Sequence, residues 1–333
     1  TLSGFKNSET LATSGVTGAA IVVTAATAST AVGTAAITDS IGTLAAANYD
    51  FTTFTPGTLT ISKAHLTVSA DNQSRLYGDA NPALTATLSG FKNSETLATS
   101  GVTGTASVVT AASASTAVGT AAITDSIGTL AAGNYDFTTF NPGTLTISKA
   151  PLGIAANSAT RLYGDANPAF SATYTGFKNA ETAAALTGTL AFATPAIPSS
   201  NVGNYAITPS GHSASNYTIG YVDGTLGVTP VSLTVSADAK SKVYGTSDPA
   251  LTFATTGLVN KPALGVADTS ASVISGALTR ASGETVLGGP YAITQGNLAA
   301  NDNYTLSSFS GNAFAITPAT LDVAAHPQSK VYG

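Results

Sequence analysis

The chain repeats itself, and this repetition limits what it can fold into more than any other feature of the sequence. Residues 1–62 recur at residues 87–148, 86 positions later, with only five differences. A unit that recurs at a fixed period is one structural module, and such modules stack on their neighbours in a tandem array. The chain is therefore expected to fold as a series of similar modules rather than as one large domain.

Two short markers show that the repetition continues to the end of the chain. A Tyr-Gly pair closes the frame L-x-[VI]-x-A-x5-[LV]-Y-G, and its tyrosines are spaced by 86, 81 and 88 residues: Tyr77, Tyr163, Tyr244 and Tyr332. An Asn-Tyr pair is spaced by 86, 82 and 87 residues, with its tyrosines at Tyr49, Tyr135, Tyr217 and Tyr304. The markers keep step and divide the chain into repeat 1 (residues 1–62), which lacks its first strand, repeat 2 (63–149), repeat 3 (150–229), repeat 4 (230–317) and residues 318–333, the first strand of a further repeat.

The local pattern within each repeat is that of short β-strands. Segments such as 66–68, 145–147 and 233–235 alternate apolar and polar residues, which is the period of a strand with one buried face. Turn sequences with Asn or Asp before proline, at residues 79–82, 165–168 and 247–249, separate such segments. Repeats of this size, rich in Gly and Thr, suit an all-β fold of small antiparallel β-sandwiches, Ig-like or similar. We expect about six to eight strands per repeat and at most one helical turn, near residues 93–97.

The connections between repeats are very short. They consist of residues 63–64, 149–151, 229–230 and 317–318, and three of the four contain proline. Linkers of this length, stiffened by proline, do not behave as flexible coils. The modules are therefore expected to be arranged end to end as a rod.

Composition argues against several functional classes. Only 9% of the residues are charged, and 12 basic residues against 17 acidic ones leave no cationic surface for nucleic acid. The absence of cysteine removes thiolate nucleophiles, disulfides and zinc–sulfur sites. The stretch from Thr10 to Thr38 is uncharged and long enough to span a bilayer, but its many Thr, Ser and Gly residues argue against a membrane span. The chain also begins without Met or an export signal, so it is expected to be a segment of a longer polypeptide.

No set of catalytic or metal-binding residues recurs from repeat to repeat. His65, His212 and His326 occupy different positions of the frame, so a nucleophilic triad is not expected. The acidic residues are too thinly scattered for the paired carboxylates of a glycosidase. Asp79 and Asn81 offer oxygen ligands in a tight loop, as calcium requires, but one Asp with an Asn before proline is more simply a turn. We therefore predict no catalytic residue, no cofactor and no metal site.

The tyrosines of the Tyr-Gly marker allow two interpretations. An exposed tyrosine ring can stack on a sugar, whereas a buried one packs in a core and hydrogen-bonds through its hydroxyl. We favour burial for Tyr77, Tyr163 and Tyr244, and sugar binding remains the alternative.

A basic residue recurs two positions before each of the four tyrosines of the Tyr-Gly marker, as Arg75, Arg161, Lys242 and Lys330. These residues are placed to pair with the acids that follow the marker, Asp79 and Asp165. Exposed pairs of this kind contribute about 0–1 kcal/mol.

The complete frame is similar to a known family. The Tyr-Gly frame, followed by D-x-N-P or S-D-P, an N-Y pair and the ending G-T-L-x-[IV]-[ST]-[KP]-A, resembles the MBG repeats, also called YDG-type repeats. This resemblance covers essentially the whole chain. It implies a stalk-forming segment of a long bacterial exported or surface protein, such as a filamentous haemagglutinin-like exoprotein. Repeat 4 departs from the ending at residues 312–316, which is expected to change packing locally without changing the fold.

The resemblance and the composition together predict a structural protein without catalysis. We expect an extracellular stalk or fibre segment, secreted or attached to the bacterial cell surface as part of an adhesin-like protein, whose repeats act as a rigid spacer. Its partners are neighbouring repeats and, on one hypothesis, other copies joined head to tail when residues 318–333 of one copy add a strand to repeat 1 of the next. The other hypothesis is that the chain is a window on a longer continuous fibre. The chief functional alternative is that the repeats themselves bind carbohydrate or a partner surface.

Overall fold

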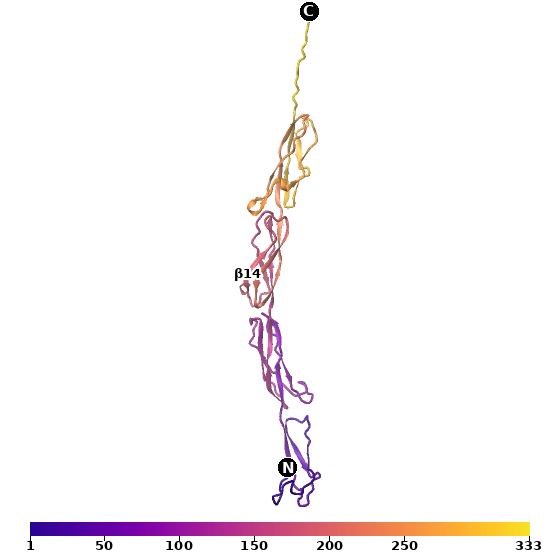
Figure 1. Cartoon of the computed structure of the whole chain (residues 1–333), viewed down its shortest axis with the longest axis vertical. Coiled ribbons are helices and arrows are strands. Elements are labelled where there is room, and N and C mark those ends of the chain that lie inside the picture. The colour runs from indigo at the N-terminus through magenta and orange to yellow at the C-terminus, as the bar shows by residue number, and fades with distance from the viewer. The chain divides into compact units, whose positions relative to one another are not determined.

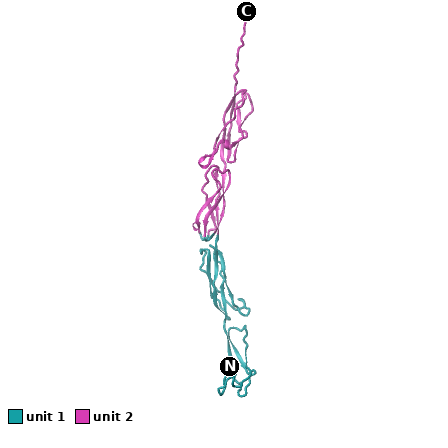
Figure 2. Cartoon of the chain, in the orientation of Figure 1, with its two compact units in different colours: residues 1–150, 178–180, 215–217 teal, residues 151–177, 181–214, 218–333 magenta.

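A computed structural model describes all residues, 1–333, and β-strands dominate it (Figure 1). The chain divides into two compact units: unit 1 comprises residues 1–150, 178–180 and 215–217, and unit 2 comprises residues 151–177, 181–214 and 218–333 (Figure 2). Helix is limited to three single turns, η1 (Ala183–Ala185), η2 (Pro262–Leu264) and α1 (Ser270–Val273). None of these turns has the length or the apolar character needed to cross a membrane. The all-β fold class of tandem small modules is thereby confirmed.

Repeat 2 shows the complete pattern of strands. It contains β4 (Ala64–Ala70), β5 (Gln73–Leu76), β6 (Ala86–Ser89), β7 (Ser107–Val109), β8 (Gly119–Ser126), β9 (Tyr135–Asn141) and β10 (Gly143–Ser148). They form two sheets with the strand orders β6-β4-β9 and β5-β10-β8-β7. We call residues 64–76 the opening segment of this repeat and residues 135–148 its closing segment, because each contributes one strand to each sheet.

Repeat 3 has the same arrangement. Its strands are β11 (Ala150–Ala156), β12 (Ala159–Leu162), β13 (Ala172–Thr175), β14 (Thr187–Ala193), β15 (Gly203–Ser213), β16 (Tyr217–Val222) and β17 (Gly224–Thr229). The sheet orders are β13-β11-β16 and β12-β17-β15-β14, the counterparts of those in repeat 2.

Repeat 4 adds short strands to this plan. It contains β18 (Val231–Ala237), β19 (Lys240–Val243), β20 (Phe253–Thr256), β21 (Asn260–Lys261), β22 (Val266–Ala267), β23 (Ile274–Ser275), β24 (Thr279–Arg280), β25 (Tyr291–Thr294), β26 (Ala299–Ala300), β27 (Tyr304–Ser310) and β28 (Asn312–Thr317). The main sheets are β20-β18-β27 and β19-β28-β25-β24, and the extra strands form the pairs β21-β22 and β23-β26.

The two ends of the chain are simpler. Repeat 1 forms a single sheet of β1 (Ile21–Thr24), β2 (Gly33–Ser40) and β3 (Gly57–Ile61), in the order β1-β2-β3. Residues 318–333 contain no strand and are exposed throughout.

The core of each complete repeat lies between its two sheets. In repeat 2, Leu66 and Val68 of β4 and Leu145 and Ile147 of β10 are at most 2% exposed, and the residues between them are more exposed. This alternation is the period-two pattern of a strand with one face in a core. Repeat 4 is built in the same way around Val235, Ile293 and Phe314, which come from both of its sheets. The apolar positions identified in the sequence are therefore the core positions.

The opening and closing segments pair in parallel, a feature that the alternation of residues does not indicate. β4 pairs with β9 from Ala64↔Tyr135 to Ser69↔Asn141, and β5 pairs with β10 from Gln73↔Leu145 to Leu76↔Ser148. The other pairings that define the sheets, such as β4 with β6 and β8 with β10, are antiparallel. Parallel pairing requires a long connection, and here the body of the repeat provides it.

The expected helical turn near residues 93–97 is not formed as a helix. Asn93 and Ser94 have left-handed backbone angles, with φ of 53° and 60°, which an α-helix does not accept. The chain closes one turn slightly later, where the N–H of Ser100 donates to the carbonyl of Thr96 at 2.9 Å.

The unusual ending of repeat 4 changes the packing locally, as expected. In repeat 2, a Cβ added to Gly143 would lie 2.6 Å from the carbonyl oxygen of Ala70, so the glycine allows the closing segment to approach the opening one. In repeat 4 this position is Asn312, whose Nδ2 donates to the corresponding carbonyl of Ala237 at 3.0 Å. A hydrogen bond thus replaces the close approach, and the strand order is unchanged.

Candidate functional site: the inter-repeat joints

The repeated markers meet where one repeat follows another, and we call these places the joints. At the joint of repeats 1 and 2, Oδ1 of Asn134 accepts the N–H of Val32 in repeat 1 at 3.0 Å. The carbonyl of the same residue accepts the N–H of Ala64, the first residue of β4, at 3.0 Å. One asparagine therefore hydrogen-bonds both to the preceding repeat and to the start of its own opening segment. We call this pair of hydrogen bonds the asparagine clasp.

The same asparagine clasp is present at the other joints. In unit 1, Asn216 accepts the N–H of Val118 at 3.1 Å and that of Ala150 at 3.0 Å. In unit 2, Asn303 accepts the N–H of Val202 at 2.9 Å and that of Val231 at 3.0 Å. The sequence shows this asparagine as a recurring residue, but only the structure shows that it acts between repeats.

The tyrosine after this asparagine fixes a loop of its own repeat. The Tyr135 hydroxyl accepts the N–H of Lys92 at 2.9 Å and donates to the Glu95 carboxylate at 2.6 Å, and this second hydrogen bond raises the pKa of Tyr135. In repeat 4, Tyr304 binds the N–H of Val259 and the Asp268 carboxylate in the same way. The loop that Tyr135 fixes carries Asn93, whose Nδ2 donates to the Ala28 carbonyl of repeat 1 at 3.0 Å.

The tyrosine of the Tyr-Gly marker is buried by the next repeat. Tyr77 packs edge-to-face on Tyr217 with ring centroids 5.5 Å apart, and Tyr163 packs on Tyr304 at 5.8 Å. Burial of Tyr77 and Tyr163 is thereby confirmed, at 3% and 7% exposed. The prediction is wrong for Tyr244, which is 54% exposed, because the residues that follow repeat 4, 318–333, form no strand and do not pack over it.

The glycine of the same marker allows the repeats to approach closely. Gly164 has a left-handed φ of 79°, and a Cβ added there would lie 2.3 Å from Cγ1 of Val259. A Cβ on Gly78 would meet the Lys178 side chain at 2.2 Å. Gly245 has a similar φ of 86° but no atom within 4 Å of its added Cβ. At Gly78 and Gly164, where a complete repeat follows, glycine is required both for its backbone angle and for the close contact. At Gly245 only the backbone angle requires it.

The acids after the marker bridge the joints, and this corrects the expected pairing. Asp79 forms an ion pair with Lys178 at 3.0 Å, and Asp165 forms one with Lys261. Neither acid pairs with the arginine that precedes the marker. The lysine partners come from loops of the following repeat, which sequence distance alone does not reveal.

The arginines before the marker are buried within their own repeats. Arg75 is 8% exposed, and its guanidinium donates to Oδ1 of Asn81 at 2.8 Å and to the Ser113 carbonyl at 2.5 Å. Arg161 makes the equivalent bonds with Asn167 and the Ile197 carbonyl, and burial lowers its pKa. Asn81 also donates to the Ala112 carbonyl at 2.6 Å, so the residue weighed above as a calcium ligand is held in a turn by hydrogen bonds.

Repeat 4 replaces these uncharged partners with carboxylates. Lys242 stands in the position of Arg75 and pairs with Asp248 at 2.7 Å and with Glu284. Arg280 binds the same two carboxylates, and its guanidinium lies 4.8 Å above the ring of Phe314. Hydrogen bonds from Arg280 and then from Lys242 lower the pKa of Asp248 to about 2. A lysine has fewer donors than an arginine and no planar fork, so carboxylates replace the amide and carbonyl partners.

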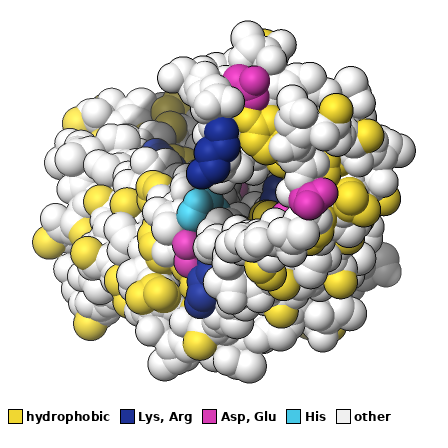
Figure 3. All heavy atoms as spheres, turned by 90° about the horizontal axis from the view of Figure 1, so that it is seen from below, with side chains coloured by type: hydrophobic (Ala, Val, Ile, Leu, Met, Phe, Trp, Pro, Cys, Tyr) yellow, Lys and Arg dark blue, Asp and Glu magenta, His cyan; other side chains and the backbone are white.

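The remaining candidate residues do not converge on one site. His65 contacts Asp136, His212 contacts the Tyr174 hydroxyl at 3.1 Å, and His326 lies in the exposed residues 318–333. No three His, Asp or Glu side chains gather as a metal ion would require. On the face shown in Figure 3, most atoms belong to uncharged side chains or backbone, and charged side chains are few.

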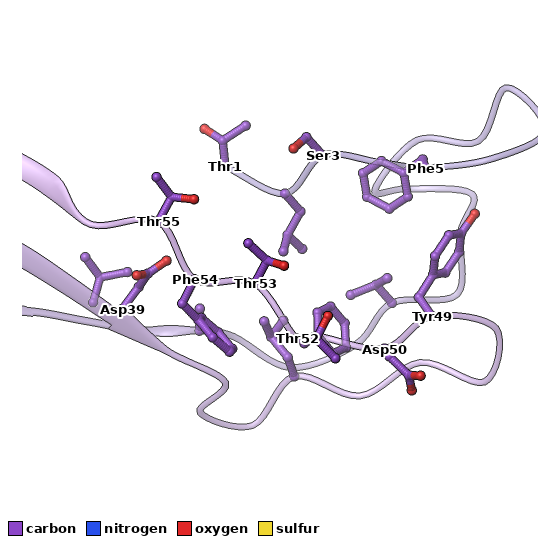
Figure 4. Close-up of a pocket in the computed structure, with 16 residues that line it drawn as sticks. Thr1, Ser3, Phe5, Asp39, Tyr49, Asp50, Thr52, Thr53, Phe54 and Thr55 are labelled. Atoms are coloured by element: carbon purple, nitrogen blue, oxygen red, sulfur yellow. The ribbon is translucent and has the colours of Figure 1, made fainter.

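Repeat 1 contains a groove with a volume of about 600 Å³ (Figure 4). Its lining includes six large apolar side chains among Thr, Ser and Asp residues: Leu2, Phe5, Val22, Leu44, Phe51 and Phe54. Its carboxylates are Asp39 and Asp50. Leu59 of β3 is 37% exposed, whereas the equivalent Leu145 of repeat 2 is fully buried.

Comparison with known proteins identifies the family. The model of the MBG domain (YGX type) matches residues 66–146, 152–227 and 233–315, which is most of the chain. The chain belongs to this family of tandem-repeat domains. No curated protein matches it. Among solved structures, it is similar to the I9–I11 tandem of titin, with 10% identity, a TM-score of 0.20, and coverage of 76% of this chain and 100% of that one.

Substitution of the marker glycines tests the contact at the joint of repeats 3 and 4. Gly164→Ala and Gly245→Ala both place alanine at a left-handed φ, which costs about 1–2 kcal/mol. Gly164→Ala also forces its Cβ into Val259. We expect the loss in unfolding free energy, measured by urea denaturation of the full chain, to be clearly larger for Gly164→Ala. Equal losses would show that the contact contributes nothing.

The charge cluster of repeat 4 should make that repeat sensitive to acid. The pKa of Asp248 is lowered from 3.8 to about 2 in the folded chain, so its ionised form stabilises the fold above pH 4 and this contribution is lost as the pH falls to 2. In scanning calorimetry, Asp248→Asn should lower one melting transition at pH 5, and the difference from the unmodified chain should vanish near pH 2. Asp322→Asn, in the exposed residues 318–333, is the control and should change no transition. A difference that persists at pH 2 would contradict the assignment.

Proposed function

We propose that the chain is a non-enzymatic spacer, a stalk or fibre segment of a bacterial adhesin-like protein. The single observation that carries this proposal is the joint, whose asparagine clasp recurs three times with the same donors and acceptors. A chain that served only to tether two domains would need no such fixed contacts between its repeats. The joints therefore favour a structure whose length and direction matter.

The burial at the joint of repeats 3 and 4 supports the same conclusion. Tyr163 and Val228 of repeat 3 share one apolar cluster with Leu233, Val259 and Tyr304 of repeat 4. Burying apolar side chains contributes about 1.5–3 kcal/mol each, which exceeds the contribution of an exposed ion pair. A continuous core across a joint resists bending more than hydrogen bonds at its rim alone.

The family resemblance supports a proposal about where the spacer works. MBG repeats occur in long bacterial exported and surface proteins, and we propose that this chain is extracellular, either secreted or attached to the cell surface.

Carbohydrate binding is the alternative, and the burial of the repeated tyrosines weighs against it. Five marker tyrosines are at most 7% exposed and present no ring face to a sugar: Tyr77, Tyr135, Tyr163, Tyr217 and Tyr304. Binding of the full chain to a glycan array would overturn this preference.

Small-angle scattering tests the spacer directly. A compact chain of 333 residues has a radius of gyration of about 20 Å, and we expect a value well above this if the joints hold the repeats in line. Insertion of a flexible Gly/Ser linker between Thr229 and Pro230 is the control, because it frees one joint and keeps both repeats. A compact radius, or a distance distribution that the linker leaves unchanged, would contradict a stiff spacer.

A further inference from the structure

The opening and closing segments of a repeat meet along their whole lengths. In repeat 2 the parallel register begins at Ala64↔Tyr135 in one sheet and ends at Leu76↔Ser148 in the other. The N–H of Tyr77 adds a hydrogen bond to the Ser148 carbonyl at 2.8 Å, at the point where the chain leaves the repeat. The two segments are therefore bonded to each other from the entry of the repeat to its exit.

This arrangement recurs in the other complete repeats. In repeat 4, β18 pairs with β27 from Val231↔Tyr304, and β19 pairs with β28 up to Val243↔Thr317. In repeat 3, β12 pairs with β17 up to Leu162↔Thr229. The same final hydrogen bond follows, from Tyr244 to the Thr317 carbonyl and from Tyr163 to the Thr229 carbonyl.

The direction of the pairing decides how tension acts on a repeat. The chain enters at the first residue of the opening segment and leaves at the last residue of the closing segment. Because the segments are parallel, a pull on the two ends slides them past each other along their own axis. All the hydrogen bonds between them are then loaded together, whereas a pull from one end of the pair would load them one after another.

Each segment is also anchored against this sliding. β4 is the central strand of its sheet, and β10 is an inner strand of the other. Side chains add bonds between the segments: Nδ2 of Asn141 donates to Oγ of Ser69 at 3.2 Å, and the N–H of Thr144 donates to Oδ1 of Asn72 at 2.7 Å. The body of the repeat, residues 77–134, lies outside the direct path of the force.

The connections between the paired segments of neighbouring repeats are too short to extend under tension. β10 ends at Ser148 and β11 begins at Ala150, so one residue separates the closing segment of repeat 2 from the opening segment of repeat 3. The same is true of Thr229 and Val231 between repeats 3 and 4. Force that leaves one parallel pair therefore enters the next directly.

We propose that each complete repeat is a load-bearing module, in which the parallel pair of opening and closing segments is a shear clamp that resists tension along the chain. This goes beyond the spacer function, because a spacer that only sets a distance does not need to resist a pull. It also stands independently of that proposal, since it rests on strand register within single repeats.

Changing the direction of the pull, without changing the fold, tests the clamp. The chain has no cysteine, so two introduced cysteines define where the handles of a single-molecule force experiment attach. In the full chain, Ser62→Cys with Ser148→Cys pulls on the entry and exit of repeat 2 and loads the pair in shear. Ser62→Cys with Gly133→Cys pulls on the same end of both segments and opens the pair bond by bond. A Cβ at Gly133 meets no atom within 4 Å, so this substitution is accommodated.

We expect the unfolding force of repeat 2 to be several-fold higher for the 62/148 pair than for the 62/133 pair. Both variants should have the same urea midpoint, since forced unfolding depends on the barrier along the pulling direction rather than on equilibrium stability. Equal unfolding forces with equal midpoints would overturn the clamp. A compact radius of gyration would instead contradict the spacer alone, so the two proposals fail separately.

Discussion

Each repeat depends on the burial of its opening segment between the rest of its strands. Leu66 and Val68 fill the core that Leu145 and Ile147 complete from the other sheet. In repeat 1, which forms the single sheet β1-β2-β3, Val22 is 62% exposed and Leu59 is 37% exposed. A module of this size has little core to spare, because small domains bury a smaller share of their surface than large ones. One short segment therefore decides whether a repeat has a closed core, and it also carries the marker tyrosine and glycine to the joint.

The joints make neighbouring repeats depend on each other through shared side chains. Asn303 and Tyr304 hold a loop and a strand of their own repeat and also contact repeat 3. The stability of such an array is a sum of repeat terms and nearest-neighbour terms. The effect of a neighbour on burial is shown by Tyr163 and Tyr244, which occupy the same frame position. Tyr163, followed by a complete repeat, is 7% exposed, and Tyr244, which is not, is 54% exposed.

Sequence reasoning identified the repeats, the family and the all-β class because these depend on periodicity, which is visible in the residues. It could not identify which strands are neighbours, because alternation at Leu66–Val68 is the same for parallel and antiparallel pairing. For Tyr77, the sequence predicted burial but not the repeat that buries it. A tyrosine buried by the next repeat and one buried in its own core produce the same recurring Tyr-Gly pattern. Asp79 was assigned to the wrong partner because Lys178 lies 99 residues away and the nearer Arg75 is already satisfied by Asn81 and a carbonyl.

The ion pairs differ from joint to joint, whereas the asparagine hydrogen bonds and the tyrosine packing stay the same. Lys178, whose ammonium pairs with Asp79, is replaced in the frame of repeat 4 by Val259, which enters an apolar cluster instead. The ion pair is not lost, because Lys261, two residues later, reaches Asp165. These lysines are 35% and 45% exposed, so solvent screening leaves their ion pairs a small share of the stability. The asparagine clasp and the edge-to-face tyrosines recur at both of these joints with nearly constant distances. Hydrogen bonds to backbone N–H groups and aromatic burial therefore set the geometry of the joint, and the surface charges adapt to it.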